Sequence, residues 1–388
     1  MRVAIVHDWL YVIGGAERVL KEILQIYPEA QLFTLFDALS DEQRRSIGFE
    51  RSKTSFLQRI PRVAKFHRHL LPLMPFAIEQ LDFAGYDLVI SSSSAVAKGV
   101  ITGPDQVHVA YVHSPMRYAW DLQHQYLKES GGCLRIKETV ARALLQRLRI
   151  WDSSSGLRAD AIVANSAYIA RRIRKTWGRK ATVIHPPVTV ASRADGLLRQ
   201  SHFLMAGRLV GYKNGAAVLE AFRLLPDQRL IVAGTGPEEK RLRGLAGPNV
   251  VFAGFVDDQE MRRLMATAKA LIFAAEEDFG IIPVEAQAEG TPVLALGRGG
   301  ARETVIDQGP RRTGMFFDEP SADDIAACVN AFLTREHTFT RGACQQQARS
   351  FSAVRFRAKF KAFVDQELRR TGHRTSLPDV PEVIRAAE

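Results

Sequence analysis

Short runs of apolar residues alternate along the chain with longer stretches in which apolar positions recur every three or four residues. Continuous apolar runs bounded by Gly, Ser or Pro are typical of buried parallel strands, whereas the longer stretches have the spacing of amphipathic helices. We predict strands at 3–8, 87–92, 108–113, 161–166, 182–187, 203–207, 229–234, 250–254, 270–275 and 291–296, and helices that include 16–27 and 216–225. The alternation predicts an α/β protein assembled from βαβ units.

The pattern of strands and helices starts a second time after a polar stretch at residues 192–200. A chain of 388 residues is too long for one ordinary domain. We therefore predict two doubly wound, Rossmann-like domains, at 1–188 and 189–350, joined by a hinge near 185–200. Ligands of such sheets bind outside the carboxyl ends of the strands, so the two domains are expected to face a common cleft.

Apolar residues recur at helical spacing near the C-terminus, with many basic residues between them. The apolar positions are Phe351, Val354, Phe356, Phe360 and Phe363. This spacing predicts an amphipathic helix over 351–370. Residues 371–388 contain Pro378 and Pro381 and no such repeat, which is typical of a mobile tail.

The net charge of the chain indicates which class of partner it binds. The formal net charge is +11 and the pI is about 9.7. An excess of this size favours an anionic partner, such as a nucleotide, a nucleic acid or an acidic lipid. No zinc finger, recognition-helix pattern or RNA-binding signature accompanies the charge, so nucleic acid explains it poorly.

The cysteines and the longest apolar runs indicate the compartment. Cys133, Cys328 and Cys344 lie far apart without metal-ligand spacing, which favours buried thiols in a reducing compartment. Neither a secretory signal nor an apolar run of about 20 residues is recognisable. The sequence therefore predicts a cytoplasmic protein that is peripheral on the membrane rather than embedded in it.

One segment combines positive charge with many apolar side chains. Between residues 51 and 80 one acid, Glu79, stands against a set of basic residues. These are Arg51, Lys53, Arg59, Arg62, Lys65 and Arg68. A basic and strongly apolar segment can lie on an anionic membrane surface, and we predict that this one does. The alternative is an ordinary pair of helices with a charged outer face.

An acidic cluster precedes a glycine and an apolar turn in the stretch AEEDFGIIPVE, residues 275–285. Pro283 suits the first turn of a helix, so Glu277 is predicted in a loop and Glu285 in the first helical turn. The spacing lets one carboxylate reach a sugar while the other reaches a ribose, with a diphosphate between them. A solvated acidic loop before a capped helix is the alternative.

The residues between these two glutamates are suited to phosphate. Gly280 permits a tight turn, and the N–H groups of Gly280, Ile281 and Ile282 then lie at the positive end of a helix. The run Glu276–Asp278 could instead bind magnesium, although adjacent carboxylates have poor chelating geometry.

Two cations follow a predicted strand in the stretch GRLVGYKN, residues 207–214. Arg208 and Lys213 are placed to neutralise a leaving diphosphate without a metal, unless the loop is merely solvated. No Asp-x-Asp pair and no His or Cys cluster with ligand spacing occurs in the sequence. We therefore expect neither a metal nor a cofactor.

The first half of the chain holds two weaker signals. Gly14-Gly15 precedes a helix and offers backbone donors to an anion, although a structural loop would have the same sequence. His113 ends a predicted strand, where it can hydrogen-bond a sugar hydroxyl. A histidine with a purely structural role is the alternative.

These motifs, in this order, resemble those of the retaining glycosyltransferases of family four, which have the GT-B fold. The resemblance rests on GGAERV, YVHSPMRYAW, ANS, GRLVGYKN, GFV, the pair Glu277-x7-Glu285 and LGRGGARETV, which together span nearly the whole chain. HSPMRYAWD and EEDFGIIPVEAQAEGTPVLALGRGG look most like mannosyltransferases of bacterial O-antigen and exopolysaccharide assembly. One departure is Gly211-Tyr212, where relatives commonly carry Pro-Glu.

The resemblance implies a role for each candidate side chain. Glu277 would hold hydroxyls of the donor sugar, and Glu285 would bind the ribose. Arg208 and Lys213 would bind the diphosphate. His113 would contact the sugar near the reacting carbon.

The resemblance also implies roles for backbone segments. The phosphate cradle would comprise Gly14, Gly15, Ile281 and Ile282. The turn Gly254-Phe255-Val256 would flank the base. The last helix would return to the N-terminal domain.

The activity that the resemblance implies is transfer of a sugar, with retention of configuration, from a nucleotide diphosphate to a hydroxyl of a lipid-linked glycan. Mannose from GDP-mannose is the donor that the subfamily likeness favours, and the pathway would be the synthesis of a cell-surface polysaccharide such as exopolysaccharide or lipopolysaccharide O-antigen. The nucleotide sugar is a substrate, and no metal is required. The alternatives are a UDP-sugar-dependent transferase, a sugar-nucleotide epimerase of the same fold, and a non-catalytic protein that binds membrane surfaces.

Overall fold

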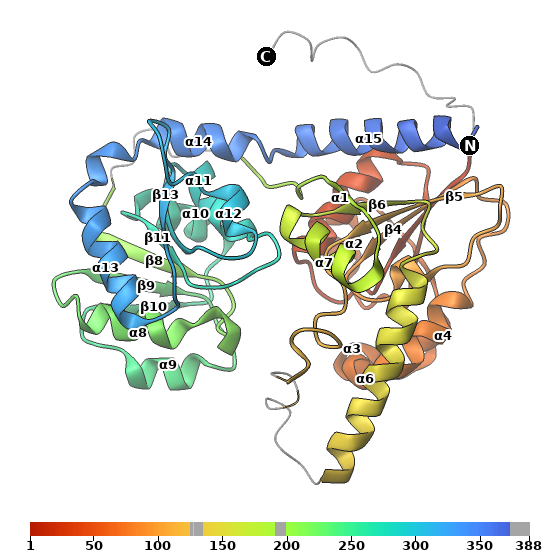
Figure 1. Ribbon diagram of the computed structural model, residues 1–388, viewed down its shortest axis with the longest axis horizontal. Coiled ribbons are helices and arrows are strands. Elements are labelled where there is room, and N and C mark those ends of the chain that lie inside the picture. Colours follow the sequence, from red (N-terminus) through yellow and green to blue (C-terminus); the bar gives the residue numbers. More distant parts are fainter. Residues whose placement is uncertain (125–126, 128–134, 191–198, 373–388) are drawn as a thin grey trace. The chain divides into compact units, whose positions relative to one another are not determined.

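The computed structural model describes residues 1–124, 127, 135–190 and 199–372, which form two compact units (Figure 1). Unit 1 comprises Met1–Val163, Ile173–Thr182 and the chain from Arg357 on, and unit 2 comprises Ala164–Arg172 and Val183–Phe356. Cys133, most of the predicted hinge (191–198) and the predicted tail from 373 lie outside the described residues.

Unit 1 is built on a seven-stranded sheet in the order β3-β2-β1-β4-β5-β6-β7. The strands are β1 (Val3–His7), β2 (Gln31–Thr34), β3 (Lys53–Thr54), β4 (Leu88–Ser93), β5 (Val107–Val112), β6 (Ala161–Ala164) and β7 (Thr182–Val183). The five strands from β3 to β5 in this order pair in parallel. In this doubly wound order the carboxyl ends of β1 and β4 meet at the topological switch point.

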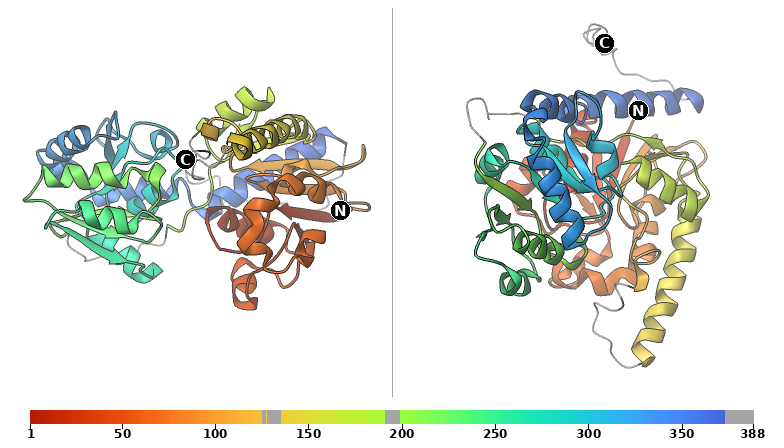
Figure 2. Two further views of the ribbon diagram at one scale, coloured as in Figure 1. Left: turned by 90° about the horizontal axis from the view of Figure 1, so that it is seen from below. Right: turned by 60° about the vertical axis from the view of Figure 1, so that its left-hand side comes forward.

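Helices cover both faces of this sheet (Figure 2). They include α1 (Gly15–Ile26), α2 (Asp41–Ile47), α3 (Val63–Phe66), α4 (Met74–Glu79), α6 (Arg135–Ser155) and the 3-10 turns η1 (Phe56–Arg59), η2 (His67–Leu73) and η3 (Ala97–Gly99). The predicted helix over 16–27 is α1 and begins one residue earlier.

The last helix is α15 (Ala353–Arg370), and its residues from Arg357 on belong to unit 1 (Figure 1). Its buried stripe repeats every four residues at Phe356, Phe360, Val364 and Leu368. The Phe360 ring lies 6.0 Å from that of Tyr111 in β5. The predicted apolar face was wrong at two positions: Val354 is 63% exposed, and Phe351 precedes the helix and packs in the core of unit 2.

Unit 2 repeats the doubly wound topology with a six-stranded sheet in the order β10-β9-β8-β11-β12-β13. Its strands are β8 (His202–Ala206), β9 (Arg229–Ala233), β10 (Val250–Gly254), β11 (Leu271–Phe273), β12 (Val293–Leu296) and β13 (Gly314–Phe317), all paired in parallel. Its helices are α8 (Gly215–Arg223), α9 (Glu239–Leu245), α10 (Asp258–Thr267), α11 (Ile281–Ala288), α12 (Ala301–Thr304), α13 (Ala322–Leu333) and α14 (Arg341–Arg349). The switch point of this sheet lies between β8 and β11.

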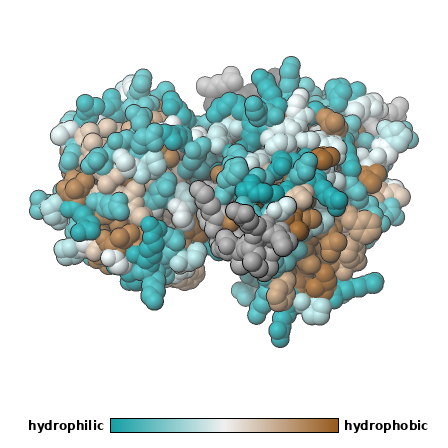
Figure 3. Space-filling model, turned by 60° about the horizontal axis from the view of Figure 1, so that its bottom comes forward, coloured by the Kyte–Doolittle hydropathy of each residue, from teal (hydrophilic) through white to brown (hydrophobic). Residues whose placement is uncertain are grey.

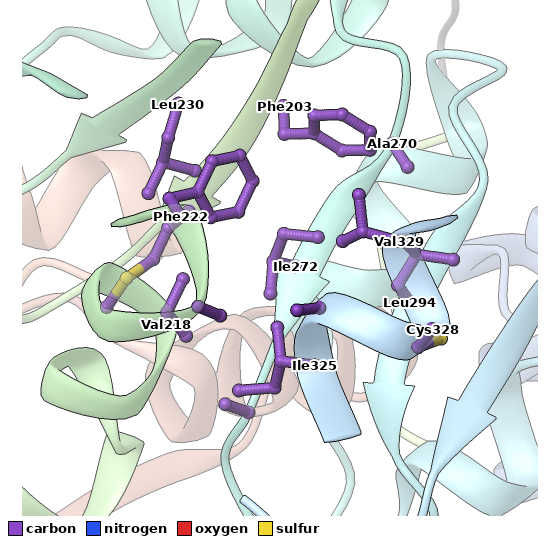
Figure 4. Close-up of a cluster of buried hydrophobic side chains, with 14 of the residues drawn as sticks. Phe203, Val218, Phe222, Leu230, Ala270, Ile272, Leu294, Ile325, Cys328 and Val329 are labelled. Carbon is purple, nitrogen blue, oxygen red and sulfur yellow. The ribbon is translucent and has the colours of Figure 1, made fainter. Parts of the chain in front are cut away.

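Alternate residues of these strands enter two cores, one on each face of the sheet. Phe203 and Ile272 pack with α8 and α13 on one face, which Figure 4 shows. Leu204 and Leu271 pack with α10 and α11 on the other face. Cys328 lies in the first of these cores, and burial raises the pKa of its thiol to about 12. Cys344 is also buried as a free thiol, so both described cysteines have the predicted burial.

A buried carboxylate fixes the switch point of unit 1. Asp8 follows β1, and its two oxygens accept the backbone N–H groups of Ser94, Ala95, Val96 and Ala97 at 2.5–2.9 Å. These residues form the loop that follows β4. Asp8 therefore closes that loop onto β1 and satisfies four amides that would otherwise be unpaired in the interior.

A buried ion pair joins η3 to α6 in the same unit. Lys98 Nζ lies 2.7 Å from Asp152 Oδ1, and the two side chains are 2% and 0% exposed. The indole N–H groups of Trp120 and Trp177 both donate to Asp152 Oδ2 at 2.8 Å. Because every charged atom has a close partner, removal of either charge leaves the other buried without compensation.

Replacing this lysine by an isosteric apolar side chain should destabilise unit 1 strongly. We expect Lys98→Met to lower the free energy of unfolding by about 3–5 kcal/mol, because Asp152 would lose its counter-charge. Urea unfolding followed by circular dichroism measures the change. Arg142→Ala is the control, since it breaks an exposed pair with Glu138 on α6 that is worth about 0.5 kcal/mol. Equal losses in the two variants would contradict the prediction.

Candidate functional site

Two of the predicted site residues meet at the switch point of unit 2. Lys213 lies in the turn η4 (Gly211–Lys213), which follows β8, and Glu277 lies in the loop between β11 and α11. Lys213 Nζ is 3.0 Å from Glu277 Oε1, and both side chains are largely buried. The two loops meet because β8 and β11 are parallel neighbours whose carboxyl ends lie at the same edge of the sheet.

The loop after β8 is held against the acidic loop by further contacts. Asn214 adopts the left-handed conformation, with φ of 53°, and its Nδ2 donates to the carbonyl of Ala274 at 2.9 Å. Gly207 has φ of +119°, and a Cβ at this position would lie 2.8 Å from Ile282 Cδ1 and 3.1 Å from Lys213 Nζ. Glycine at 207 therefore lets the loop approach the start of α11 closely.

Arg208 is the other predicted cation of this loop. Its side chain is exposed, and among the described residues it has no hydrogen-bond or ion-pair partner. The guanidinium therefore keeps its donors for an anion, whereas the ammonium of Lys213 already holds Glu277. An ammonium has three N–H donors, so Lys213 can hold Glu277 and a phosphate oxygen together.

The loop after β9 also packs into this region, although it was not among the predicted site residues. A Cβ on Gly234 would lie 2.1 Å from the carbonyl oxygen of Gly207, and one on Gly236 would lie 2.2 Å from that of Leu209. The backbone of GTG (234–236) therefore packs directly against the loop that carries Arg208 and Lys213. A Gly-x-Gly directly after a predicted strand is the signal that could have found it.

Each carboxylate of the Glu276–Asp278 run has its own partner. Besides the Glu277–Lys213 pair, Tyr168 Oη donates to Glu276 Oε1 at 2.7 Å, and Arg172 donates to Asp278 Oδ1 at 3.2 Å. The three side chains are thus drawn toward different groups. No cluster of three or more His, Cys, Asp or Glu suited to a metal occurs among the described residues.

Tyr168 and Arg172 lie on α7 (Ala167–Trp177), whose first half belongs to unit 2. This segment was predicted to lie in the first domain, but Glu303 of α12 accepts the N–H groups of Ala167 and Tyr168 at 2.7 and 2.9 Å. His185 Nε2 lies 3.0 Å from the same carboxylate. Burial raises the pKa of Glu303, but these hydrogen bonds outweigh it and hold the pKa below its usual value. An ionised Glu303 thus fastens α7 to unit 2.

The helix after the acidic loop is α11, and Pro283 lies in its first turn, as predicted. Gly280 is its N-cap, with φ of +84°, and Ile281 and Ile282 are its first two residues. Their N–H groups have no partner within the helix and lie at its positive end, as predicted for an anion site. Glu285 is the fifth helical residue, so its predicted place in the first turn was wrong, and it is only partly exposed.

The turn predicted to flank the nucleobase follows β10, the third strand of unit 2 along the chain. Gly254 ends β10 with φ of +69°, and its carbonyl accepts the N–H of Gly234 at 2.7 Å. Phe255 is 81% exposed, and Val256 packs against the core beneath it. The exposed ring is a flat apolar face on which a nucleobase could stack.

The candidates of unit 1 lie at the other switch point. Gly14 is the N-cap of α1 and Gly15 its first residue, but the N–H of Gly14 donates to Glu17 Oε2 at 2.8 Å. That predicted donor is therefore occupied within the chain. His113 follows β5, is partly exposed, and has Nε2 at 2.8 Å from Ser92 Oγ. Burial lowers the pKa of His113 to about 3, so the ring is neutral at physiological pH.

Two parallel-sheet units of Rossmann type, with cations and helical N–H groups at a switch point, define the GT-B architecture. Two family models match this chain: "Glycosyltransferase Family 4" over residues 13–192 and "Glycosyl transferases group 1" over residues 194–351. The chain belongs to glycosyltransferase family 4.

Relatives of known name share about half of the chain. A D-inositol 3-phosphate glycosyltransferase of Mycobacterium sp. (strain KMS) is 30% identical over 223 residues, 50% of this chain and 49% of the relative. A GDP-mannose-dependent monoacylated alpha-(1-6)-phosphatidylinositol monomannoside mannosyltransferase of Corynebacterium glutamicum is 30% identical over 209 residues, 46% of this chain and 54% of the relative. The chain thus spans about half the length of the curated relatives it matches.

A solved structure covers more of the chain at lower identity. HepE of Anabaena in complex with UDP superposes with a TM-score of 0.69 at 19% identity, over 94% of this chain and 100% of that one. This likeness confirms the predicted fold.

The acidic loop rests on a glycine that tolerates no side chain. A Cβ on Gly300 would lie 2.3 Å from Cα of Phe279, and the N–H of Gly300 donates to the carbonyl of Glu277 at 2.9 Å. We expect Gly300→Ala to displace the loop and to weaken the binding of nucleoside diphosphates about tenfold to a hundredfold. Titration calorimetry with GDP and UDP measures this.

The matched control is Gly342→Ala, because a Cβ on that residue of α14 meets nothing within 4 Å. The control should bind as the unchanged protein does. Unchanged binding by a folded Gly300→Ala variant would show that the position of the acidic loop has no bearing on the nucleotide.

Proposed function

We propose that this chain is a retaining glycosyltransferase that transfers a sugar from a nucleotide diphosphate donor to a hydroxyl of a lipid-linked glycan in cell-surface polysaccharide synthesis. Our preferred donor is GDP-mannose. The Lys213–Glu277 pair at the switch point of unit 2, beside Arg208, is the observation that carries the proposal. A cation and a carboxylate at one spot suit a ligand that offers both anionic phosphates and sugar hydroxyls.

The proposed chemistry follows from the charges. When the diphosphate leaves, negative charge grows on its oxygens, and Arg208, Lys213 and the N–H groups that begin α11 neutralise it. Glu277 fixes hydroxyls of the sugar, and Glu285 binds the ribose. Holding donor and acceptor hydroxyl in one geometry supplies the remaining acceleration. No divalent ion is needed in this scheme, since the three carboxylates at 276–278 hold protein groups instead.

The choice of donor rests on relatives. The Corynebacterium relative and a Mycolicibacterium smegmatis relative, 28% identical over 225 residues, are both named GDP-mannose-dependent mannosyltransferases. A UDP-sugar is the second candidate, because the superposed HepE structure is a complex with UDP. The exposed ring of Phe255 would stack on either base.

Removing either partner of the central pair should abolish transfer. We expect Glu277→Gln and Lys213→Ala to lower kcat/KM about a hundredfold or more with the better of GDP-mannose and UDP-glucose, because each removes a contact to the reacting part of the donor. Transfer to a lipid-linked glycan primer, followed by mass spectrometry, measures the rate. Chelation of divalent ions with EDTA should leave the rate unchanged.

Two exposed residues of unit 2 provide controls of matched charge. Asp227→Asn and Arg229→Ala change exposed groups at the amino end of β9, the edge of the sheet opposite the switch point, and both variants should retain full activity. Full activity of Glu277→Gln and Lys213→Ala would overturn the proposed site. A strict requirement for a divalent ion would overturn the proposed chemistry.

We also propose that residues 51–80 attach the enzyme to an anionic membrane surface, where a lipid-linked acceptor resides. Phe56, Phe66, Leu73 and Phe76 are 40–58% exposed, and the rings of Phe56 and Phe76 lie 5.8 Å apart. Arg59, Arg62, Lys65 and Arg68 are exposed in the same segment. In Figure 3, apolar surface gathers on unit 1 among hydrophilic side chains. Among the described residues no helix is long and apolar enough to cross a membrane.

Polar replacement of two exposed rings should release the protein from vesicles. We expect the double variant Phe66→Ser, Phe76→Ser to lose most of its co-sedimentation with vesicles of phosphatidylglycerol and phosphatidylcholine, because the rings supply apolar contact that basic residues alone do not. Raising the salt concentration should weaken binding of the unchanged protein. Leu224→Ser, a 55% exposed residue of unit 2, is the control and should bind normally. Undiminished binding of the double variant would contradict the proposal.

A further inference from the structure

Four polar side chains are connected across the carboxyl edge of the unit 1 sheet. Glu17 Oε1 lies 3.3 Å from His7 Nε2, His7 Nδ1 lies 3.1 Å from Ser92 Oγ, and Ser92 Oγ lies 2.8 Å from His113 Nε2. Glu17 lies on α1, and the other three groups lie on β1, on β4 and directly after β5, three strands that are neighbours in this order in the sheet. His7, Glu17 and Ser92 are 2%, 7% and 0% exposed, so water does not compete for these contacts.

The direction of the hydrogen bonds follows from the charge of Glu17. Burial raises the pKa of Glu17, but the hydrogen bonds that the carboxylate accepts from His7 and from the N–H of Gly14 lower it, and the pKa lies below its usual value. Glu17 is therefore an ionised carboxylate at neutral pH and can only accept. Nε2 of His7 must then carry the proton that is shared with Glu17.

The position of that proton sets the directions of the other two hydrogen bonds. With a single proton on the His7 ring, held on Nε2, the Nδ1 atom is an acceptor, and the hydroxyl of Ser92 then donates to Nδ1. Ser92 Oγ then has only lone pairs to offer to His113, and His113 Nε2 must donate to it. A neutral His113 with its proton on Nε2 has its free lone pair on Nδ1.

We propose that Glu17, His7 and Ser92 are positioning residues that hold His113 in the Nε2–H tautomer, so that Nδ1 accepts a hydrogen bond from a hydroxyl of the donor sugar. The inference deepens the proposed function and rests on it. A hydroxyl that donates to a lone pair becomes richer in electrons. That favours the positive charge that develops on the sugar as the diphosphate departs.

The same carboxylate also fixes the glycine turn of unit 1. Glu17 Oε1 faces His7, whereas Oε2 accepts the N–H of Gly14. Glu17 therefore couples the start of α1 to the orientation of His113. Loss of this carboxylate should disturb both, whereas loss of the Ser92 hydroxyl should disturb only the ring.

The neighbouring residue offers a matched control. Ser91 Oγ lies 2.8 Å from His108 Nε2, and both residues are 0% exposed. Because successive strand residues face opposite sides of a sheet, this second serine–histidine pair lies on the other face, away from the chain of contacts that ends at His113. Ser91→Ala and Ser92→Ala each remove one buried hydroxyl that bonds to a histidine.

The decisive experiment compares these two variants in the full chain. Long-range ¹H–¹⁵N spectra of the unchanged protein should show His113 as the Nε2–H tautomer, and Ser92→Ala should mix the tautomers. We expect Ser92→Ala to lower kcat about tenfold or more, because a ring with the proton on Nδ1 cannot accept from the sugar. Ser91→Ala should keep kcat within about twofold. Both variants should bind GDP or UDP as the unchanged protein does, since neither touches the diphosphate.

The Glu17 variants test the end of this chain of hydrogen bonds that lies farthest from His113. Glu17→Gln keeps an oxygen that accepts from His7 Nε2–H and should retain most of the activity, whereas Glu17→Ala should lose it. An Nδ1–H tautomer of His113, or equal kcat in the two serine variants, would overturn the proposal that Glu17, His7 and Ser92 orient His113. If the unchanged protein binds no nucleoside diphosphate and transfers no sugar, the proposed function fails instead, and the spectra still decide the tautomer.

Discussion

The parallel pairing of β8 with β11 is the constraint on which the candidate site depends. Lys213 and Glu277 are far apart in sequence, yet each follows one of two neighbouring strands and their charged atoms lie 3.0 Å apart. A reversal in strand order separates the helices that follow these strands, so two loops and a helix N-terminus gather at one edge. Any change that moved β8 or β11 along its neighbour would separate the pair before it touched either side chain.

Charge balance within the acidic loop explains its shape. Three adjacent carboxylates repel one another. Here each has its own partner: a tyrosine hydroxyl donates to the first, and a lysine and an arginine form ion pairs with the other two. Two of these partners come from α7, which Glu303 fastens to unit 2. The partly buried Lys213–Glu277 pair is thereby oriented from both sides. Arg208, without a partner among the described residues, keeps the positive charge that attracts an anion.

Much of the fold was predictable because ten of the strands are apolar runs bounded by turn residues. β2, β3 and β13 were missed, and β3 (Lys53–Thr54) holds no apolar residue that could have marked it. Lys213 and Glu277 were predictable because both follow recognisable strands. Tyr168, Arg172 and Glu303 were not, since their contacts join segments more than 100 residues apart. For Arg172 in particular, no local pattern reveals a partner as distant as Asp278.

The two units share one topology but fill their switch points differently, and this difference bears on the division of roles. In unit 1 the four amides after β4 are taken by Asp8, and the N–H of Gly14 is taken by Glu17, so acidic side chains of the chain already occupy the positions that suit an anion. In unit 2 the corresponding edge carries Lys213, Arg208 and the first N–H groups of α11. A diphosphate would meet backbone amides already held by carboxylates at the first edge, whereas at the second edge the guanidinium of Arg208 has no partner among the described residues. Electrostatics therefore favours unit 2 for the nucleotide, whereas unit 1 contributes the neutral ring of His113, whose orientation Glu17 helps to fix.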